Sequence, residues 1–255
     1  MKTGRERRRA RKAGLALAAA ALAVAAARSV RLAVAEGLFF TGRAEAVRRA
    51  AALEPRRALY HLAAAEAEIL AGKDPRERLR AAVRASPYDA SLRVRLGLEA
   101  EARGDLAEAR AQLLAAAERS RKYLPRWTLA GYFFRRGDEG RFWRWAGAAF
   151  AVAPGNPEAL FDLCWKMEPD AAAILERALP ERPGVRLAFA EFLLRRGEWA
   201  QLARVAARLL ENPQPNHLPG LLGLVDGLAA HGEIQAAVEI WNGLCRRGWL
   251  PWDEK

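Results

Sequence analysis

The sequence predicts an all-α fold, a tandem array of antiparallel helix pairs, and two observations support that prediction. The first is a set of glycines that each follow a stretch with helical periodicity, at steps of 30, 32, 33, 60 and 35 residues: Gly42, Gly72, Gly104, Gly137, Gly197 and Gly232. The step of 60 corresponds to two periods with one glycine missing near residues 167–170. The second observation is alanine and glycine at positions where paired helices would cross. A fixed period in the thirties is typical of helical repeat proteins, in which neighbouring units bury one another's apolar faces.

The composition is that of a globular protein, with 255 residues of which 52% are hydrophobic and 28% charged. The net charge is +12, and residues 1–12 contribute half of it, because seven lysines and arginines there accompany the single acid Glu6. The rest of the chain carries the remaining +6 without a base-stacking or groove-entering motif. The charge therefore does not predict nucleic-acid binding.

The first element, residues 13–30, is expected to be a hydrophobic helix that anchors the chain in a membrane. Residues 13–27 form an uncharged run behind the basic flank. Three interpretations stay open: an uncleaved signal anchor, a signal peptide cleaved after residues 25–27, and a soluble amphipathic start. The run is shorter than the roughly 20 residues of a typical span, which favours cleavage. We favour the anchor, because no helix breaker follows the run, Arg28 and Arg31 can snorkel, and the next helix is needed for the first repeat.

An anchor of this kind sets the expected topology. Basic flanks stay in the cytoplasm, so residues 1–12 are predicted to be cytoplasmic and the repeat domain, residues 31–248, extracytoplasmic. Arginines also follow the apolar run, which moderates this bias. If the signal is cleaved, the chain is secreted instead. Residues 249–255 form a C-terminal tail.

The repeat domain is expected to contain six to seven helix pairs. Their ranges are 28–55, 56–87, 90–121, 124–154, 157–180 (a shortened pair), 183–213 and 218–248. In the clearest unit, 90–121, the first helix carries Leu96 and Gly97, the turn lies at Gly104, and the second helix carries Ala109. Small residues at these positions let two helix axes approach closely.

This unit resembles the tetratricopeptide repeat family in the large-small pair Leu96-Gly97 and in the small residues Ala109 and Ala116 of its second helix. It departs from the family at Ala100, which stands in an aromatic slot, and it lacks the closing proline. The resemblance extends over all the pairs in degenerate form. It implies a tetratricopeptide-like α-solenoid that binds proteins on a concave face lined by the first helices. The residues that the resemblance assigns to this face are Tyr60, Leu98, Glu101, Thr128, Tyr132 and Arg135.

No arrangement of residues predicts catalysis. The histidines His61, His217 and His231 lie in different units without partners at metal-ligand spacing. No glycine-rich phosphate loop and no Gly-x-Ser-x-Gly motif occurs. We therefore expect a non-enzymatic protein with no metal and no cofactor. Cys164 and Cys245 are 81 residues apart in a fold where only neighbouring units touch, so both are expected to be free thiols that pack as small hydrophobic residues.

Aromatic residues concentrate in residues 123–165, which hold 11 of the chain's 21. Most of them are expected to form a packing core. Tyr132, Phe133 and Phe134 are consecutive and point about 100° apart around a helix, so at least one should face outward. Exposed aromatics mark contact sites. The segment therefore suggests an alternative function, carbohydrate binding by stacking on sugar rings.

The last helix pair has no polar capping helix after it. Its final helix presents Ala237, Trp241 and Leu244, and only the tail 249–255 follows. Repeat arrays normally end in a helix with a polar outer face. Either the tail folds back over the open end, which we favour, or another subunit or a further domain covers it. A self-associating structural array therefore stays a further alternative.

The function that these features predict is a membrane-anchored, non-enzymatic scaffold on the extracytoplasmic side. Its partner would be another protein, which the sequence does not name. By analogy with other anchored repeat proteins, we expect a place in envelope or surface-polymer assembly.

Overall fold

The structure, a computed structural model, describes residues 4–252. Every regular element in that range is a helix, so the predicted all-α fold is confirmed. The chain forms two compact units, Met1–Arg119 and Ser120–Lys255. The basic flank 1–12 and the tail 249–255 each extend beyond the described range, at residues 1–3 and 253–255.

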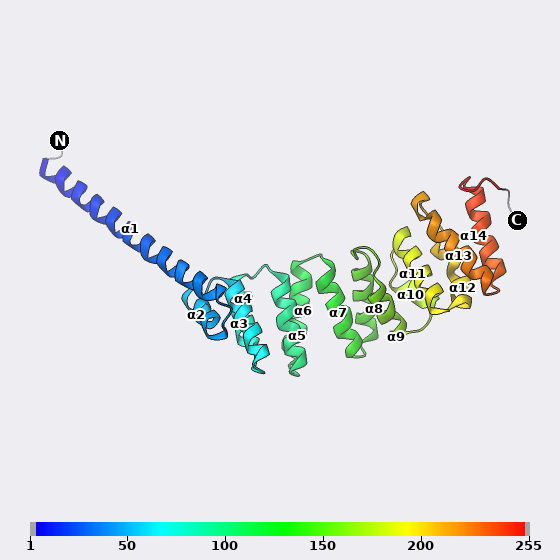
Figure 1. Cartoon of the computed structure of the whole chain (residues 1–255), viewed down its shortest axis with the longest axis horizontal. Coiled ribbons are helices and arrows are strands. Elements are labelled where there is room, and N and C mark those ends of the chain that lie inside the picture. The colour runs from blue at the N-terminus through cyan, green and yellow to red at the C-terminus, as the bar shows by residue number, and fades with distance from the viewer. Residues whose placement is uncertain (1–3, 253–255) are drawn as a thin grey trace. The chain divides into compact units, whose positions relative to one another are not determined.

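Unit 1 contains three antiparallel helix pairs in which each helix contacts the next (Figure 1). The pairs are α1 (Gly4–Phe40) with α2 (Ala44–Leu53), α3 (Ala58–Leu70) with α4 (Arg76–Ala85), and α5 (Ala90–Ala102) with α6 (Leu106–Arg119). The three pairs correspond to the first three predicted repeats.

Unit 2 contains four helix pairs, the second of which is short, as predicted. They are α7 (Tyr123–Arg135) with α8 (Glu139–Phe150), α9 (Glu158–Met167) with α10 (Ala171–Arg177), α11 (Pro183–Arg196) with α12 (Trp199–Leu209), and α13 (Leu218–Ala230) with α14 (Ile234–Arg246); a 3₁₀ turn, η1 (Pro215–His217), precedes α13. First helices contact the first helices of neighbouring pairs, and second helices contact second helices. This two-layered stacking of hairpins is the packing expected of a tetratricopeptide-like solenoid, and the prediction of six to seven pairs is confirmed.

The periodic glycines end the first helix of a pair. All six predicted positions have φ between 64° and 85°, the left-handed region that favours glycine. The α9–α10 turn, where the period skips, is built differently. There the Asp170 carboxylate accepts hydrogen bonds from the backbone N–H groups of Ala172 and Ala173, at 2.8 and 3.1 Å. Aspartate also caps the second helix in two of the glycine turns, at Asp105 and Asp138, so the α9–α10 turn keeps this cap and differs in lacking the glycine.

Small residues sit where α5 and α6 cross, as predicted. Leu96, Ala100, Ala109 and Ala116 are fully buried. A Cβ atom at Gly97 would lie 2.7 Å from Leu113 Cγ and 3.2 Å from the Ala109 carbonyl oxygen. The two helices are therefore close enough that only glycine fits at this crossing.

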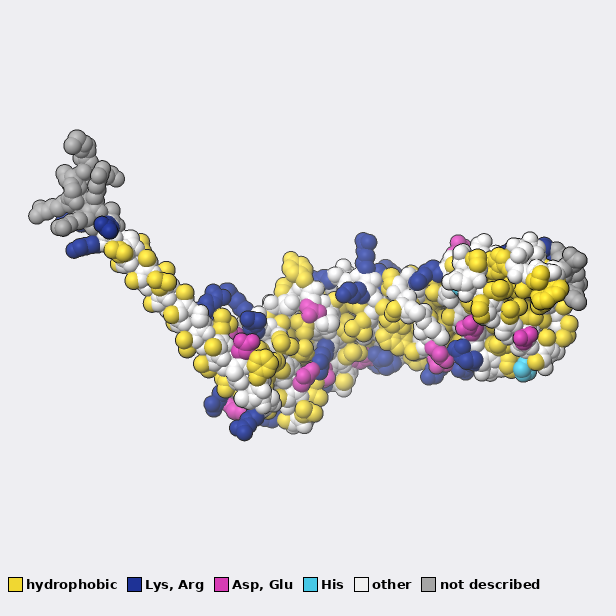
Figure 2. Space-filling model, turned by 45° about the horizontal axis from the view of Figure 1, so that its top comes forward, with side chains coloured by type: hydrophobic (Ala, Val, Ile, Leu, Met, Phe, Trp, Pro, Cys, Tyr) yellow, Lys and Arg dark blue, Asp and Glu magenta, His cyan; other side chains and the backbone are white. Residues whose placement is uncertain are grey.

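Helix α1 is one continuous element that begins as an exposed rod and ends in the core of unit 1. All side chains from residue 11 to residue 31 are exposed, and Figure 2 shows the rod lined with apolar side chains. Farther along, Ala35 is fully buried and the Phe39 ring lies 5.0 Å from the ring of Tyr60. The predicted boundary between residues 30 and 31 falls inside this helix. By length and composition, Arg11–Phe40 is suited to crossing a membrane, a property that signal sequences share.

Polar side chains join neighbouring pairs at separations of about one period. In unit 1, Arg80 Nε donates to Glu108 Oε1 at 2.7 Å, across 28 residues. In unit 2, Gln201 Oε1 accepts from the Ala171 backbone N–H at 2.9 Å, across 30 residues. The Arg80–Glu108 pair is part-buried, and the Gln201–Ala171 bond is uncharged. Both bonds connect side chains of one helix pair to the next pair, and they therefore align one hairpin on its neighbour.

Candidate partner-binding surface

Two first helices of unit 1, α3 and α5, present equivalent stripes that are exposed except at the half-buried residues Ala63 and Arg95. Residues spaced four, three and four apart lie on one face of a helix. On α3 this stripe consists of Leu59, Ala63, Glu66 and Leu70, and on α5 the positions 32 residues later are Ser91, Arg95, Leu98 and Ala102. We call these eight residues the first-helix face of unit 1.

Large apolar side chains are unusually exposed on this face. The exposed fractions of Leu59, Leu70 and Leu98 are 57, 90 and 41%. Between them, Arg95 Nη1 donates to Glu66 Oε1 at 2.9 Å and links α5 to α3. Exposed leucines around a half-exposed ion pair provide both apolar contact area and polar groups that can orient a partner.

The structure separates the six residues that the resemblance assigned to a concave face. Leu98 and Arg135 are exposed and Glu101 is half-buried, whereas Tyr60, Thr128 and Tyr132 are only 5, 7 and 4% exposed. The side chains of these last three are therefore not accessible to a partner. Leu98 and Glu101 belong to unit 1 with Tyr60, and the other three belong to unit 2.

Each buried member of the set has a local partner. The Tyr60 ring packs against Phe39, and the neighbouring Leu59 takes the face position instead. Thr128 Oγ1 donates to the Leu124 carbonyl oxygen at 2.8 Å. The Tyr132 ring meets Phe133 edge to face at 5.2 Å. A partner-binding role for Leu98, Glu101 and Arg135 stays a prediction.

The sequence analysis did not identify Leu59, Leu70 or the Glu66–Arg95 pair. The signal that identifies them is the period itself. Leu98 is exposed, and counting back 32 residues from it reaches Glu66, whose helix face includes Leu59 and Leu70 rather than Tyr60.

The aromatic segment 123–165 is mainly core. Seven of its eleven rings are buried, and they continue into the next pair through ring contacts such as Phe150–Phe161 at 5.1 Å and Phe161–Phe189 at 5.2 Å. The other four, among them Phe134, are half-buried. Sugar binding by stacking needs open ring faces, so this arrangement does not favour the carbohydrate-binding alternative.

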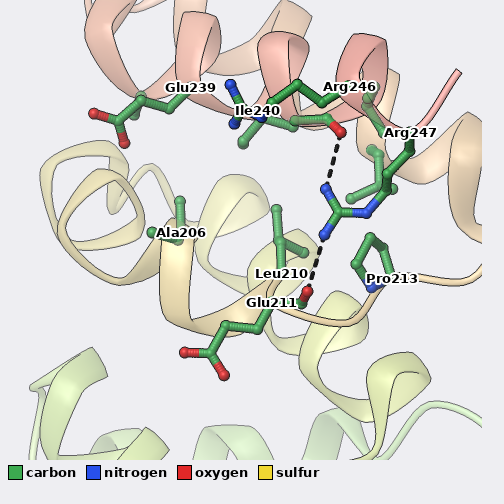
Figure 3. A pocket seen from close by; sticks show the side chains of 13 residues that line it. Ala206, Leu210, Glu211, Pro213, Glu239, Ile240, Arg246 and Arg247 are labelled. Atoms are coloured by element: carbon green, nitrogen blue, oxygen red, sulfur yellow. Dashed lines mark hydrogen bonds between the residues drawn. The ribbon is translucent and has the colours of Figure 1, made fainter. Parts of the chain in front are cut away.

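A pocket of about 330 Å³ opens between α12 and α14 in unit 2 (Figure 3). Its wall includes Ala206, Leu210 and Ile240. The Arg247 guanidinium crosses one end and donates to the Gly243 and Glu211 carbonyl oxygens at 2.9 and 3.0 Å. These bonds occupy the arginine in holding the last two pairs together, which makes the pocket a packing feature of the array's end.

The tail returns over the final helix, as favoured from the sequence. The Trp252 ring stacks on Trp241 with centroids 5.4 Å apart and planes at 25°. Ile234 at the start of the same helix is still 54% exposed. The described part of the tail therefore covers Trp241 in the middle of α14 and leaves Ile234 at its start exposed.

Both cysteines are free, as predicted. Cys164 is buried, and its burial raises the pKa of the thiol above the ordinary range. Cys245 is only half-buried. Among residues 4–252, no three His, Cys, Asp or Glu side chains gather in a group that could hold a metal ion.

Comparison with protein-family models finds no match, and comparison with curated proteins finds none. Among solved structures, the chain is similar to one described as a functional characterization of PilF from Pseudomonas aeruginosa. The match has a TM-score of 0.31 and 18% sequence identity, and it covers 86% of this chain and 91% of that chain. A likeness at this level adds nothing to the functional argument. The tetratricopeptide resemblance therefore rests on the stacked helix pairs, their glycine turns and their small crossing residues.

Proposed function

We propose that this chain is a membrane-anchored, non-enzymatic scaffold that binds another protein through the first-helix face of unit 1. The observation that carries the proposal is the continuity of α1. Its apolar part is exposed around the whole circumference, and one face of its end packs in the first helix pair, with Ala35 fully buried and Leu38 and Phe39 half-buried. A helix that is apolar on all sides needs an apolar environment on all sides, which a bilayer supplies.

The length of the apolar part supports a span. At 1.5 Å per residue, residues 13–30 extend about 27 Å, close to the roughly 30 Å hydrocarbon core of a bilayer. Arg28 lies near the end of this segment and can direct its guanidinium to the interface. The seven basic residues of the flank 1–12 favour a cytoplasmic N-terminus, which would place both units on the extracytoplasmic side, in envelope or surface-polymer assembly.

The chemistry of the first-helix face suggests the kind of partner. Leu59, Leu70 and Leu98 offer separate apolar contacts, and the Glu66–Arg95 pair lies among them. An amphipathic segment of another protein, with apolar residues flanking a polar centre, would complement this pattern.

Site-specific photocrosslinking in intact cells tests this function. A benzoylphenylalanine placed at Leu70 or Leu98 is expected to form one and the same discrete protein adduct. Ala111, an exposed residue on the second helix α6, is the matched control and should form none. Equal adducts at all three positions, or none at the two leucines, would refute a partner-binding role for this face.

A further inference from the structure

A groove lies where α1 leaves the proposed membrane span. Its volume is about 580 Å³, and it is lined by Val24, Ala27, Arg28, Arg31, Glu54, Pro55 and Arg56. Residues 24, 28 and 31 follow helical spacing and lie on one face of α1. The turn between α2 and α3, residues 54–56, forms the opposite wall. Figure 2 shows basic side chains gathered where the rod joins the first helix pair.

The groove is charged at one end and apolar at the other. Three arginines and one glutamate line it, a net charge of +2. Glu54 is buried and accepts from Arg31 Nε at 2.9 Å, so these two groups neutralise each other. The side chains of Arg28 and Arg56 make no hydrogen bond or ion pair with another residue of the described range, and both are exposed. Val24 and Ala27, which belong to the apolar run, line the apolar end of the groove.

The position along α1 matches a membrane interface. Counting 1.5 Å per residue from Lys12, Arg28 lies about 24 Å and Arg31 about 28 Å along the helix. A hydrocarbon core of roughly 30 Å would therefore end close to these arginines. A guanidinium at this depth is costly unless an anion accompanies it. Anionic headgroups lie at this level of a bilayer, and the acyl chains lie below them.

We propose that this groove binds the headgroup of an anionic phospholipid, with Arg28 and Arg56 on the phosphate and Val24 and Ala27 beside the acyl chains. The proposal rests on the membrane anchoring proposed above. A bound lipid would connect the span to the α2–α3 turn and fix the orientation of unit 1 on the bilayer. Arginine suits this role because its planar guanidinium pairs with two phosphate oxygens at once.

The test compares two variants of the full chain that lose the same charge. Arg28→Gln with Arg56→Gln removes the free arginines of the groove, and Arg43→Gln with Arg84→Gln removes two exposed arginines elsewhere in unit 1. Each protein is placed in micelles with equal phosphatidylglycerol and phosphatidylcholine, and native mass spectrometry counts the lipids retained. The basic flank contributes the same background to both variants.

The wild type and the control variant are expected to retain phosphatidylglycerol about thirtyfold better than the groove variant, from two arginines near a headgroup. Excess inorganic phosphate should not displace the lipid, because it lacks the acyl chains. Equal retention by both variants, or displacement by phosphate, would overturn the proposal. Extraction of cell membranes with alkali separates the lipid-binding proposal from the anchoring proposal. A groove variant that stays in the membrane and retains phosphatidylglycerol as well as the wild type refutes only lipid binding by the groove. A wild type that is washed off the membrane refutes the anchor.

Discussion

At the scale of single residues, small side chains determine how closely paired helices pack. Gly97 faces Leu113 and the Ala109 backbone at distances that leave no room for a Cβ atom. Gly37 in α1 has no neighbour within 4 Å of such an atom. At Gly97 glycine therefore permits two helices to pack closely. At Gly37 it only lowers the helix propensity of α1.

Substitution of these two glycines tests the close crossing. Gly97→Val should lower the stability of unit 1 by about 1–3 kcal/mol, because the added atoms overlap Leu113. Gly37→Ala should leave it unchanged or raise it by up to about 1 kcal/mol, through helix propensity alone. Chemical denaturation of the full chain followed by circular dichroism measures both. A neutral Gly97→Val would show that α5 and α6 are farther apart than described.

The carboxylate of Asp74 gives a pH-dependent prediction. The hydrogen bonds from the Arg76 side chain lower the pKa of Asp74 to about 2. Because the pKa of Asp74 is lower in the folded than in the unfolded state, the interaction of its carboxylate with Arg76 stabilises the fold at pH values above the ordinary pKa near 3.9. This stabilisation is lost as the pH falls through about 2. Titration of Asp74 by carboxyl NMR should show the low pKa, and Arg76→Gln should raise it toward the ordinary value. An unchanged pKa in that variant would mean that Arg76 is not its cause.

At the scale of elements, helix pairs are closed by local turns and aligned by side chains one period apart. Arg76 takes part in both kinds of contact. Its guanidinium pairs with Asp74, just before its own helix, at 2.7 Å and with Asp105 of the next helix pair at 3.2 Å. In the last described pair, the ring of Trp252 from the tail stacks on Trp241 of α14.

Removal of that stacking tests the role of the tail. Trp252→Ala should speed amide hydrogen exchange in α14 while leaving α11 unchanged, because only the final pair loses its cover. Hydrogen exchange followed by mass spectrometry resolves the two helices. Tyr88→Ala, at an exposed aromatic in a turn of unit 1, is the control and should alter neither. Unchanged exchange in α14 of the tail variant would show that Trp252 does not protect the final pair.

The helix pairs could be predicted because their signals are local. Each glycine turn and each small crossing residue, such as Gly97, is determined by residues within the same pair. The candidate partner-binding surface could not be predicted as well, because Tyr60 and Leu59 differ by one position and Tyr60 is the one that packs against Phe39. Bonds between pairs, such as Arg95 to Glu66, likewise depend on how the hairpins stack.

At the scale of the whole molecule, the sequence predicted one repeat domain, residues 31–248, and the structure describes two units divided after Arg119. The glycine period does not reveal this division, because it runs from Gly104 to Gly137 at the usual 33 residues. A division of this kind depends on contacts between pairs, which the period does not encode. The apolar segment of α1 and the first pair, in contrast, belong to one continuous helix and must be oriented together.

The central claim is that α1 remains attached and serves both as membrane span and as first arm of the array. Its most direct test is the mass of the mature protein recovered from alkali-washed membranes of cells that express it. We predict a membrane-retained chain that still carries residues 13–30. A soluble chain whose N-terminus lies just after Ala27 would contradict the account, because the apolar run would then be a discarded signal peptide.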